Sequence, residues 1–171
     1  MSHSTKQLGT AFIWGGWIIF FIVLALVFQR YLDGEYNPNR ELETRRTDAY
    51  DEIVLRRNRQ GHYLLNGQIN GKTVTFLVDT GATTTSLPLS WAKPLGLPIG
   101  PRFQVSTANG TADAYLTTID SLKLGDIEFR DIKASLNPGL DDDQALLGMN
   151  VIKRMDLLQR GDLMVLRKYR Q

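Results

Sequence analysis

The longest apolar run of the chain lies near its N-terminus. No charged side chain occurs between Gln7 and Phe28, and the stretch AFIWGGWIIFFIVLALVF, residues 11–28, is long enough to cross a hydrocarbon core as a helix. A cleavable signal peptide has a shorter apolar core followed by small residues at the cut site, whereas this run is long and bulky. The pattern therefore predicts a short tail over residues 1–10 and an uncleaved transmembrane helix over residues 11–28.

The next segment, residues 29–60, has a different composition. It holds seven arginines and seven acids with few large apolar residues, and such a mixed-charge segment is not expected to bury a core. We therefore expect a solvated linker, with at most a short helix in RELETRRTDAYDEIVLRR. The balanced charge of this segment argues against a nucleic-acid arm, and no nucleic-acid partner is expected; the formal charge of +2 for the whole chain says little about partners.

Residues 61–171 consist of short alternating runs broken by turn residues, which is typical of a β-rich domain. The Asn-Gly pairs at residues 70–71 and 109–110 tolerate the positive φ angles of tight turns and predict one hairpin each. A third turn is expected at residues 125–126, and a last strand in LMVLRK near the end. Short helices are expected in LSWAKPLG and MNVIKRM. The sequence thus predicts a mostly β domain.

One acid, Asp79, ends the apolar strand TFLV and leads directly into the turn residues Thr80 and Gly81. An ionised carboxylate beside apolar side chains is costly to desolvate unless it is paired or shares a proton. Its place at a strand end suits catalysis. A phosphoryl-acceptor role is the weaker alternative, because that chemistry normally uses further carboxylates for magnesium and alternating βα units, whereas this chain predicts strands joined by hairpins.

The stretch VDTGAT, residues 78–83, resembles the Asp-Thr-Gly signature of aspartic proteases in its single-motif, retropepsin-like form. A second stretch, ALLGMN at residues 145–150, is similar to that family's apolar pair followed by glycine and a short helix. The Asn-Gly hairpin at residues 109–110 lies between the two, where the family has its flap. The whole chain resembles a bacterial, membrane-anchored retropepsin-like protease. The resemblance implies a mostly β acid-protease half-barrel with a flap hairpin and short helices.

By this resemblance, Asp79 would be the catalytic residue. Thr80 would use its hydroxyl to hold two active-site loops together, and Gly81 would let the backbone approach the substrate. Ala82 completes this loop and stands where pepsin-like enzymes often have serine. An ordinary strand-to-turn connection is the structural alternative for Thr80 and Gly81.

The resemblance also assigns the second motif and the flap. Leu146 and Leu147 would form the apolar pair, and Gly148 would pack under the catalytic loop because a Cβ there would collide with it. Asn109 and Gly110 would form the flap tip, although an Asn-Gly hairpin in isolation is more often only a hairpin.

Hydrolysis of a peptide bond without metal or thiol can use two carboxylates that share a proton, one activating water while the other protonates the carbonyl. The chain has no cysteine and one Asp-Thr-Gly, so the second carboxylate would be Asp79 of another copy. Like charges held about 3 Å apart in aspartic proteases cannot both ionise, which makes such an acid tolerable among apolar residues. We therefore expect a homodimer that cleaves protein or peptide substrates without a cofactor.

Two further features of the sequence have more than one interpretation. The acid run Asp141–Asp143 is interpreted as a solvated loop rather than a metal site, because the chain has no second cluster of ligands and its only histidines are His3 and His62. For the domain as a whole, a non-catalytic dimerisation or peptide-binding module tethered to the membrane is the alternative function.

The sequence gives two answers on membrane orientation. Basic residues are more numerous after the apolar run than before it, and a strict count would place the C-terminal domain in the cytoplasm. The resemblance instead implies a single-pass protein of a bacterial inner membrane whose C-terminal domain lies on the periplasmic side. We adopt the periplasmic placement as the expectation.

Overall fold

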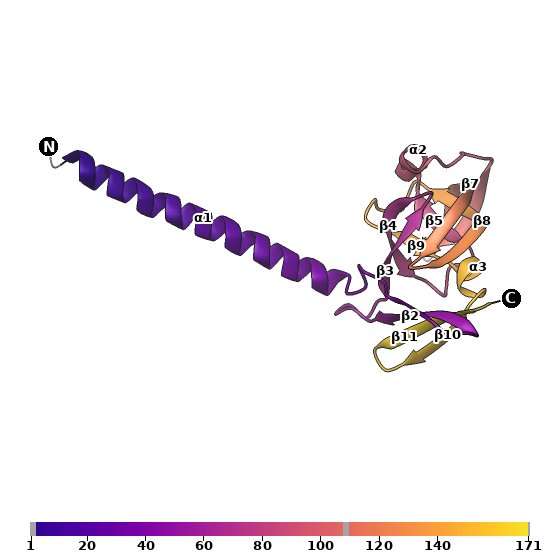
Figure 1. The fold of residues 1–171 in the computed structure, drawn as a ribbon. Helices are drawn as coiled ribbons and strands as arrows, with labels where there is room; N and C mark the ends of the chain where they lie inside the picture. Colours follow the sequence, from indigo (N-terminus) through magenta and orange to yellow (C-terminus); the bar gives the residue numbers. More distant parts are fainter. Residues whose placement is uncertain (1–2, 108–109, 171) are drawn as a thin grey trace. The chain divides into compact units, whose positions relative to one another are not determined.

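The computed structural model describes residues 3–107 and 110–170 (Figure 1). It divides the chain into two compact units, Met1–Tyr36 and Asn37–Gln171. Each unit is described by itself below.

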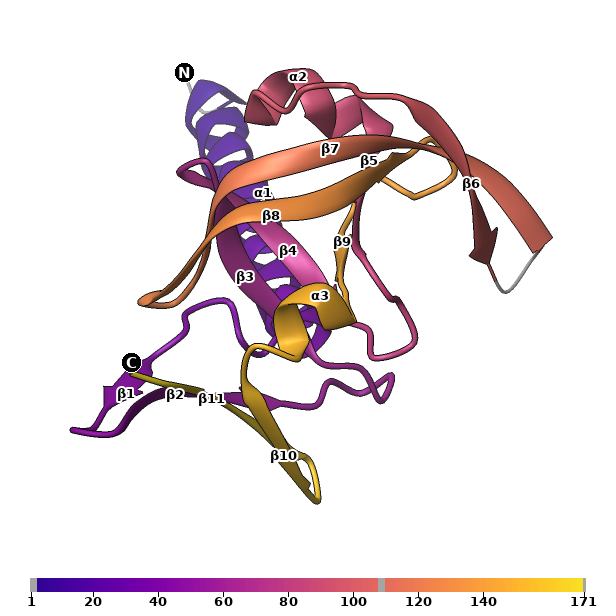
Figure 2. The same cartoon turned by 90° about the vertical axis from the view of Figure 1, so that its right-hand side faces the viewer.

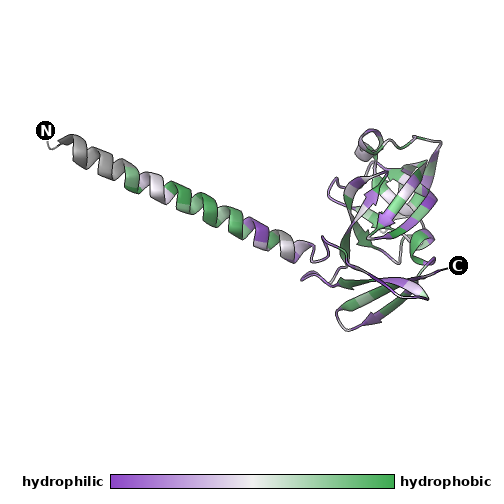
Figure 3. Ribbon diagram, viewed as in Figure 1, coloured by the Kyte–Doolittle hydropathy of each residue, from purple (hydrophilic) through white to green (hydrophobic). Residues whose placement is uncertain are grey.

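The first unit consists of helix α1 (His3–Tyr36). Within its stretch Phe12–Tyr36, an 18-residue window has a mean hydropathy of 2.3, and the stretch is long and apolar enough to cross a membrane. Figure 3 shows much of this stretch in the colour of hydrophobic residues. The helix includes the predicted span over residues 11–28 and continues beyond it.

The smaller sheet of the second unit has four antiparallel strands in the order β1–β2–β11–β10 (Figure 2). Strand β2 pairs along its whole length with β11, so the beginning and the end of this unit meet in one sheet. The bounds are Thr44–Arg46 for β1, Tyr50–Arg56 for β2, Asp156–Arg160 for β10 and Leu163–Tyr169 for β11.

The larger sheet has seven strands in the order β3–β4–β9–β5–β8–β7–β6, and a further pairing of β3 with β7 closes it on itself. The pairs β4–β9 and β5–β8 are parallel. The strand bounds are Leu64–Ile69 (β3), Lys72–Val78 (β4), Thr85–Pro88 (β5), Arg102–Thr107 (β6), Gly110–Leu124 (β7), Ile127–Asn137 (β8) and Ala145–Leu147 (β9). Three short helices are Leu89–Trp91 (η1), Ala92–Leu95 (α2) and Met149–Ile152 (α3).

Two of the predicted hairpin turns occur at the residues where the sequence predicts them. Asn70 and Gly71, with φ angles of 49° and 80°, join β3 to β4, and Gly125, with φ of 58°, lies in the turn between β7 and β8. Asn109, in the other expected turn, lies outside the described residues, whereas Gly110 begins β7 with φ of 112°. The mostly β architecture with short helices is confirmed.

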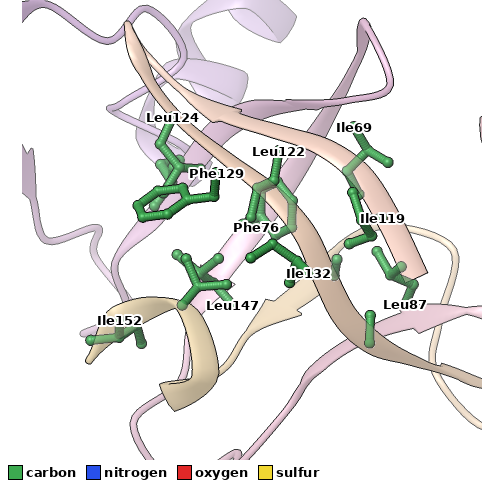
Figure 4. Close-up of a cluster of buried hydrophobic side chains, with 14 of the residues drawn as sticks. Ile69, Phe76, Leu87, Ile119, Leu122, Leu124, Phe129, Ile132, Leu147 and Ile152 are labelled. Atoms are coloured by element: carbon green, nitrogen blue, oxygen red, sulfur yellow. The ribbon is translucent and has the colours of Figure 1, made fainter. Parts of the chain in front are cut away.

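The core of the second unit lies against the larger sheet (Figure 4). Phe76 from β4, Leu122 from β7, Ile132 from β8 and Leu147 from β9 belong to one cluster and are fully buried. Burial of these side chains removes apolar area from water and fixes the strands that carry them. The ends of β4 and β9, from which the two sequence motifs continue, are therefore held by the core.

The expectation of a solvated linker over residues 29–60 is wrong for its second half. Strand β2 lies there in place of a short helix, and its Ile53 and Leu55 are fully buried in the same core. From Ile53 to Arg56 buried and exposed positions alternate, so Ile53 and Leu55 lie on one face and Val54 on the other. On the other face Glu52 pairs with Arg167 of β11 at 2.7 Å. The average composition of residues 29–60 does not reveal this alternation.

Asn39 fixes the same segment to the larger sheet. Its Nδ2 donates to the carbonyl oxygens of Arg56 (2.9 Å) and Leu64 (2.6 Å), and its Oδ1 accepts the Arg56 N–H at 2.7 Å. The side chain is buried, so these bonds satisfy groups that water does not reach. The compact unit thus begins well before residue 61.

We predict that Ile53→Ala lowers the free energy of unfolding by about 3 kcal/mol, because it leaves a cavity in the core. The matched control is Val54→Ala on the next residue of β2, whose side chain is 45% exposed. This control should cost less than about 1 kcal/mol. Urea denaturation of the full chain in detergent micelles measures both variants. Equal losses for the two would contradict the packing of β2 into the core.

Candidate active site

Asp79 directly follows β4 and is held by the backbone around it. Its N–H donates to the Leu147 carbonyl oxygen of β9 at 3.1 Å, and its Oδ1 accepts the Gly81 N–H at 2.8 Å. The Ala82 N–H donates to the Asp79 carbonyl oxygen at 3.3 Å and closes the turn. The carboxylate is therefore fixed by its own loop at the end of β4, whose Phe76 is buried in the core.

The tip of this loop is open to solvent. Thr80 and Gly81 are exposed, and Asp79 and Ala82 are half-buried. A Cβ on Gly81 would lie 3.2 Å from the Asp79 Oδ1, so a side chain there would crowd the carboxylate. The loop thus leaves both its backbone and its acid accessible, as a site that receives a substrate requires.

The second motif packs against the loop of the first motif. Strand β9 runs parallel to β4 with Leu147 opposite Val78, which places Gly148 against the loop that follows Asp79. A Cβ on Gly148 would lie 2.5 Å from the carbonyl carbon and 2.7 Å from the carbonyl oxygen of Thr84. Real Cβ atoms do not approach backbone so closely, so this position requires glycine.

Backbone hydrogen bonds complete the contact between the two motifs. The Met149 N–H donates to the Ala82 carbonyl oxygen at 2.8 Å, and the Asn150 N–H donates to the Thr83 carbonyl oxygen at 3.1 Å. Leu146, half-buried, and Leu147, fully buried, anchor β9 beside β4. Backbone hydrogen bonds therefore join the start of helix α3 to the loop that follows Asp79.

Asn150 is a positioning residue that the sequence reasoning did not single out. Its Oδ1 accepts the Thr85 N–H (2.9 Å) and the Thr85 hydroxyl (3.0 Å), and its Nδ2 donates to the Lys133 carbonyl oxygen at 2.7 Å. The Thr85 Oγ1 in turn accepts the Gly148 N–H at 3.3 Å. The sequence feature that could have identified it is an amide side chain two residues after Gly148, because an amide can donate and accept hydrogen bonds at the same time.

The predicted flap corresponds to the β6–β7 hairpin, which pairs from Arg102 and Tyr115 to Thr107 and Gly110. Arg102 also forms an ion pair with Asp113 across the hairpin. Its hydrogen bond to Asp113 raises the pKa of the guanidinium. Gly110 is exposed, and its role at a flap tip remains a prediction.

The acid run lies on a loop that enters β9. Asp141, Asp142 and Asp143 are exposed, and Asp142 accepts a hydrogen bond from the Ser90 hydroxyl. Within the part of the chain that the structure describes, no group of three or more histidines and acids could hold a metal ion. The loop that carries Asp79 offers one carboxylate, which is half of the pair that general acid–base hydrolysis uses.

Known proteins share this sequence pattern. Residues 65–154, more than half of the chain, match the family model for the gag-polyprotein putative aspartyl protease. An uncharacterized protein encoded in the cobV 5′ region of Sinorhizobium sp. is 33% identical over 81% of this chain and 66% of its own length. An uncharacterized protein of Rickettsia prowazekii is 27% identical over 81% of this chain and 62% of its own length. The chain therefore spans slightly less than two thirds of the length of these relatives.

A solved structure agrees with the family match. The crystal structure of a retropepsin-like aspartic protease from Rickettsia conorii is 30% identical, with a TM-score of 0.60, and the similarity covers 73% of this chain and 98% of that one. This chain belongs to the family of retropepsin-like aspartic proteases.

Proposed function

We propose that the chain is a membrane-anchored aspartic endopeptidase in which Asp79 from two subunits activates a water molecule. The observation that carries the proposal is the fixed carboxylate of Asp79, bonded to the Gly81 N–H at 2.8 Å in an otherwise exposed turn. The turn is buttressed by Gly148, whose position leaves no room for a side chain. A loop of this kind holds its acid in place before a substrate arrives.

The chemistry needs two carboxylates in different protonation states. The ionised Asp79 takes a proton from water as the oxygen attacks the peptide carbonyl, and the protonated Asp79 gives its proton to the carbonyl oxygen. The tetrahedral intermediate then breaks its C–N bond. The leaving nitrogen takes the proton that the first Asp79 had removed from water, and a hydroxyl of the intermediate returns a proton to the second Asp79 as the carboxyl group forms. Two nearby acids share one proton because their charges repel, so each subunit can supply an identical residue.

The homodimer follows from the single acid in each loop. A two-fold axis beside Asp79 would bring two exposed loop tips together, with Thr80 placed to donate its hydroxyl across the axis. The substrate would be a protein or peptide, held between the paired loops and the β6–β7 hairpins that end at Gly110. Asp79, Thr80, Gly81 and Ala82 thus have the roles that the family signature implies.

Helix α1 is the proposed anchor. Its apolar stretch Phe12–Tyr36 has none of the burial expected for the core helix of a soluble protein. Two chains held in one bilayer meet at a much higher effective concentration than free domains, so a modest dimer affinity suffices. We place the helix as a single span of a bacterial inner membrane with the protease unit on the periplasmic side.

We predict that Asp79→Asn lowers peptide cleavage by about a thousandfold, because the amide keeps the shape of the carboxylate but cannot act as a base. Cleavage of a peptide library by the full chain in detergent micelles measures the effect. Asp120→Asn, which changes an exposed acid on β7 in the same way, is the matched control and should cleave like the unmodified chain. Undiminished cleavage by the Asp79 variant would remove the protease proposal, and absence of cleavage by every form would favour the peptide-binding alternative.

Membrane orientation gives a separate prediction. An alkaline phosphatase reporter fused after Gln171 folds only outside the cytoplasm, so it should be active in bacteria that express the full chain. A matching fusion to β-galactosidase, which is active only in the cytoplasm, should be silent. The opposite pair of results would place the protease unit on the cytoplasmic side, as the count of basic residues suggests.

A further inference from the structure

The first half of strand β4 has a partner strand on one side only. Strand β3 pairs with β4 from Lys72 to Leu77, whereas β9 pairs only with its last three residues, 76–78. No strand among the described residues pairs with the other side of residues 72–75. An unpaired strand edge presents backbone donors and acceptors that can pair with another extended chain. This half of β4 is therefore an open edge inside the larger sheet.

The backbone of Thr73 points toward this open edge. Along a strand of an antiparallel pair, residues bonded to the partner alternate with residues whose backbone groups point the other way. The Asp79 N–H points away from β3, because it donates to the Leu147 carbonyl oxygen of β9 at 3.1 Å. Thr73 is an even number of residues from Asp79 and has the same direction. Strand β9 begins opposite Phe76, so it does not reach Thr73.

A groove of about 450 Å³ lies along the open edge. Strand β4 and helix α2, which both line it, are labelled in Figure 1. Trp91, half-buried, and Leu95, buried, give the groove an apolar wall. The Lys72 ammonium, also in the lining, donates to the Pro94 carbonyl oxygen. An open edge beside such a wall suits an extended peptide, because main-chain bonds hold the peptide and pockets receive alternate side chains.

The loop of residues 138–144, between β8 and β9, gives the groove a negative rim. Asp143 lines the groove, and Asp141 and Asp142 precede it on the same loop; all three are exposed. Asp142 accepts a hydrogen bond from Ser90 of η1, the short helix that carries Trp91. Within the described part of the chain none of the three acids forms an ion pair. Their charge is complementary to basic side chains.

We propose that this groove is a docking site for an extended, basic segment of the protein substrate. The segment adds to the open edge of β4 as a strand, with lysine or arginine side chains facing Asp141–Asp143. The proposal rests on the proposed function, because it assigns a second contact to the same substrate. Strand β4 leads directly to Asp79. A segment held at the groove raises the effective concentration of the rest of the substrate at the active site.

Peptide binding tests the groove without any cleavage. The probe is a fluorescently labelled peptide of alternating lysine and valine, about six residues long, which is the usual length of a strand. The protein is the full chain with Asp79→Asn in non-ionic detergent micelles, and fluorescence anisotropy gives the dissociation constant. A peptide of alternating glutamate and valine should bind at least about tenfold more weakly, because its charges repel the acids.

A second comparison tests strand addition. The lysine–valine peptide with a methyl group on every peptide nitrogen keeps its charges but cannot donate backbone hydrogen bonds. We expect its dissociation constant to rise at least about tenfold. Equal binding of the two forms would show that charge alone holds the peptide and would overturn the proposal.

Charge reversals on the protein locate the site. In the Asp141→Lys/Asp143→Lys variant the dissociation constant of the lysine–valine peptide should rise about tenfold, and the glutamate–valine peptide should bind more tightly than before. The matched control is Glu43→Lys/Asp48→Lys, which makes the same change in net charge at exposed acids near β1. It should leave both constants unchanged. Equal effects of the two double variants would mean that the groove is not the binding site.

Enzyme kinetics test the role in substrate binding. A peptide that the full chain cleaves is joined to the lysine–valine segment through a long Gly-Ser linker. We expect KM to fall about tenfold with kcat unchanged, because the added segment contributes equally to the binding of substrate and transition state. The Asp141→Lys/Asp143→Lys variant should lose this gain and should cleave the unjoined peptide normally. An unchanged KM for the joined peptide would contradict the docking role.

These readouts separate the docking proposal from the protease proposal. If the Asp79→Asn chain binds the peptides as expected but no form cleaves, the docking site stands and the protease proposal fails. If cleavage requires Asp79 but the double variants bind the peptides alike, the protease stands and the docking site is wrong. If the groove instead receives a second copy of the chain, Asp141→Lys/Asp143→Lys would change self-association in sedimentation and no peptide would bind, which also overturns the proposal.

Discussion

The contact between Gly148 and the backbone of Thr84 is the constraint on which the candidate site depends. A Cβ at Gly148 would lie 2.5 Å from the carbonyl carbon of Thr84. Only glycine therefore lets the second motif approach the loop after Asp79 this closely. That approach permits the hydrogen bonds from Met149 and Asn150 to the loop. Asp79 is then placed by a folded framework that the two motifs build together.

Local sequence patterns were sufficient for much of the fold and the site. The Asn70-Gly71 turn was predictable because positive φ angles favour those two residues, whatever the rest of the chain does. The Asp-Thr-Gly loop and Gly148 were identified by resemblance to the family's two motifs, each of which is short and continuous in the sequence. The role of Asn150 was not, because its partner Thr85 is 65 residues away and becomes a neighbour only after β5, β8 and β9 have assembled.

Strand β2 also shows that local sequence patterns do not reveal contacts between distant segments. Its composition is that of a solvated segment, but Ile53 and Leu55 are fully buried because the strand pairs with β11 at the far end of the chain. A pairing between such distant segments is not visible in the local sequence, apart from the spacing of Ile53 and Leu55 two residues apart. The smaller sheet is therefore assembled from both ends of the second unit.

The central claim is that each active site contains Asp79 from two chains, and a mixing experiment tests it most directly. The full chain and its Asp79→Asn variant are exchanged in detergent micelles at constant total concentration, and peptide cleavage is measured against the variant fraction. If both acids are required, activity falls with the square of the unmodified fraction, so an equal mixture retains about one quarter of the full rate. A linear decline, with about half of the rate at equal mixture, would show that one Asp79 suffices and would contradict the shared site.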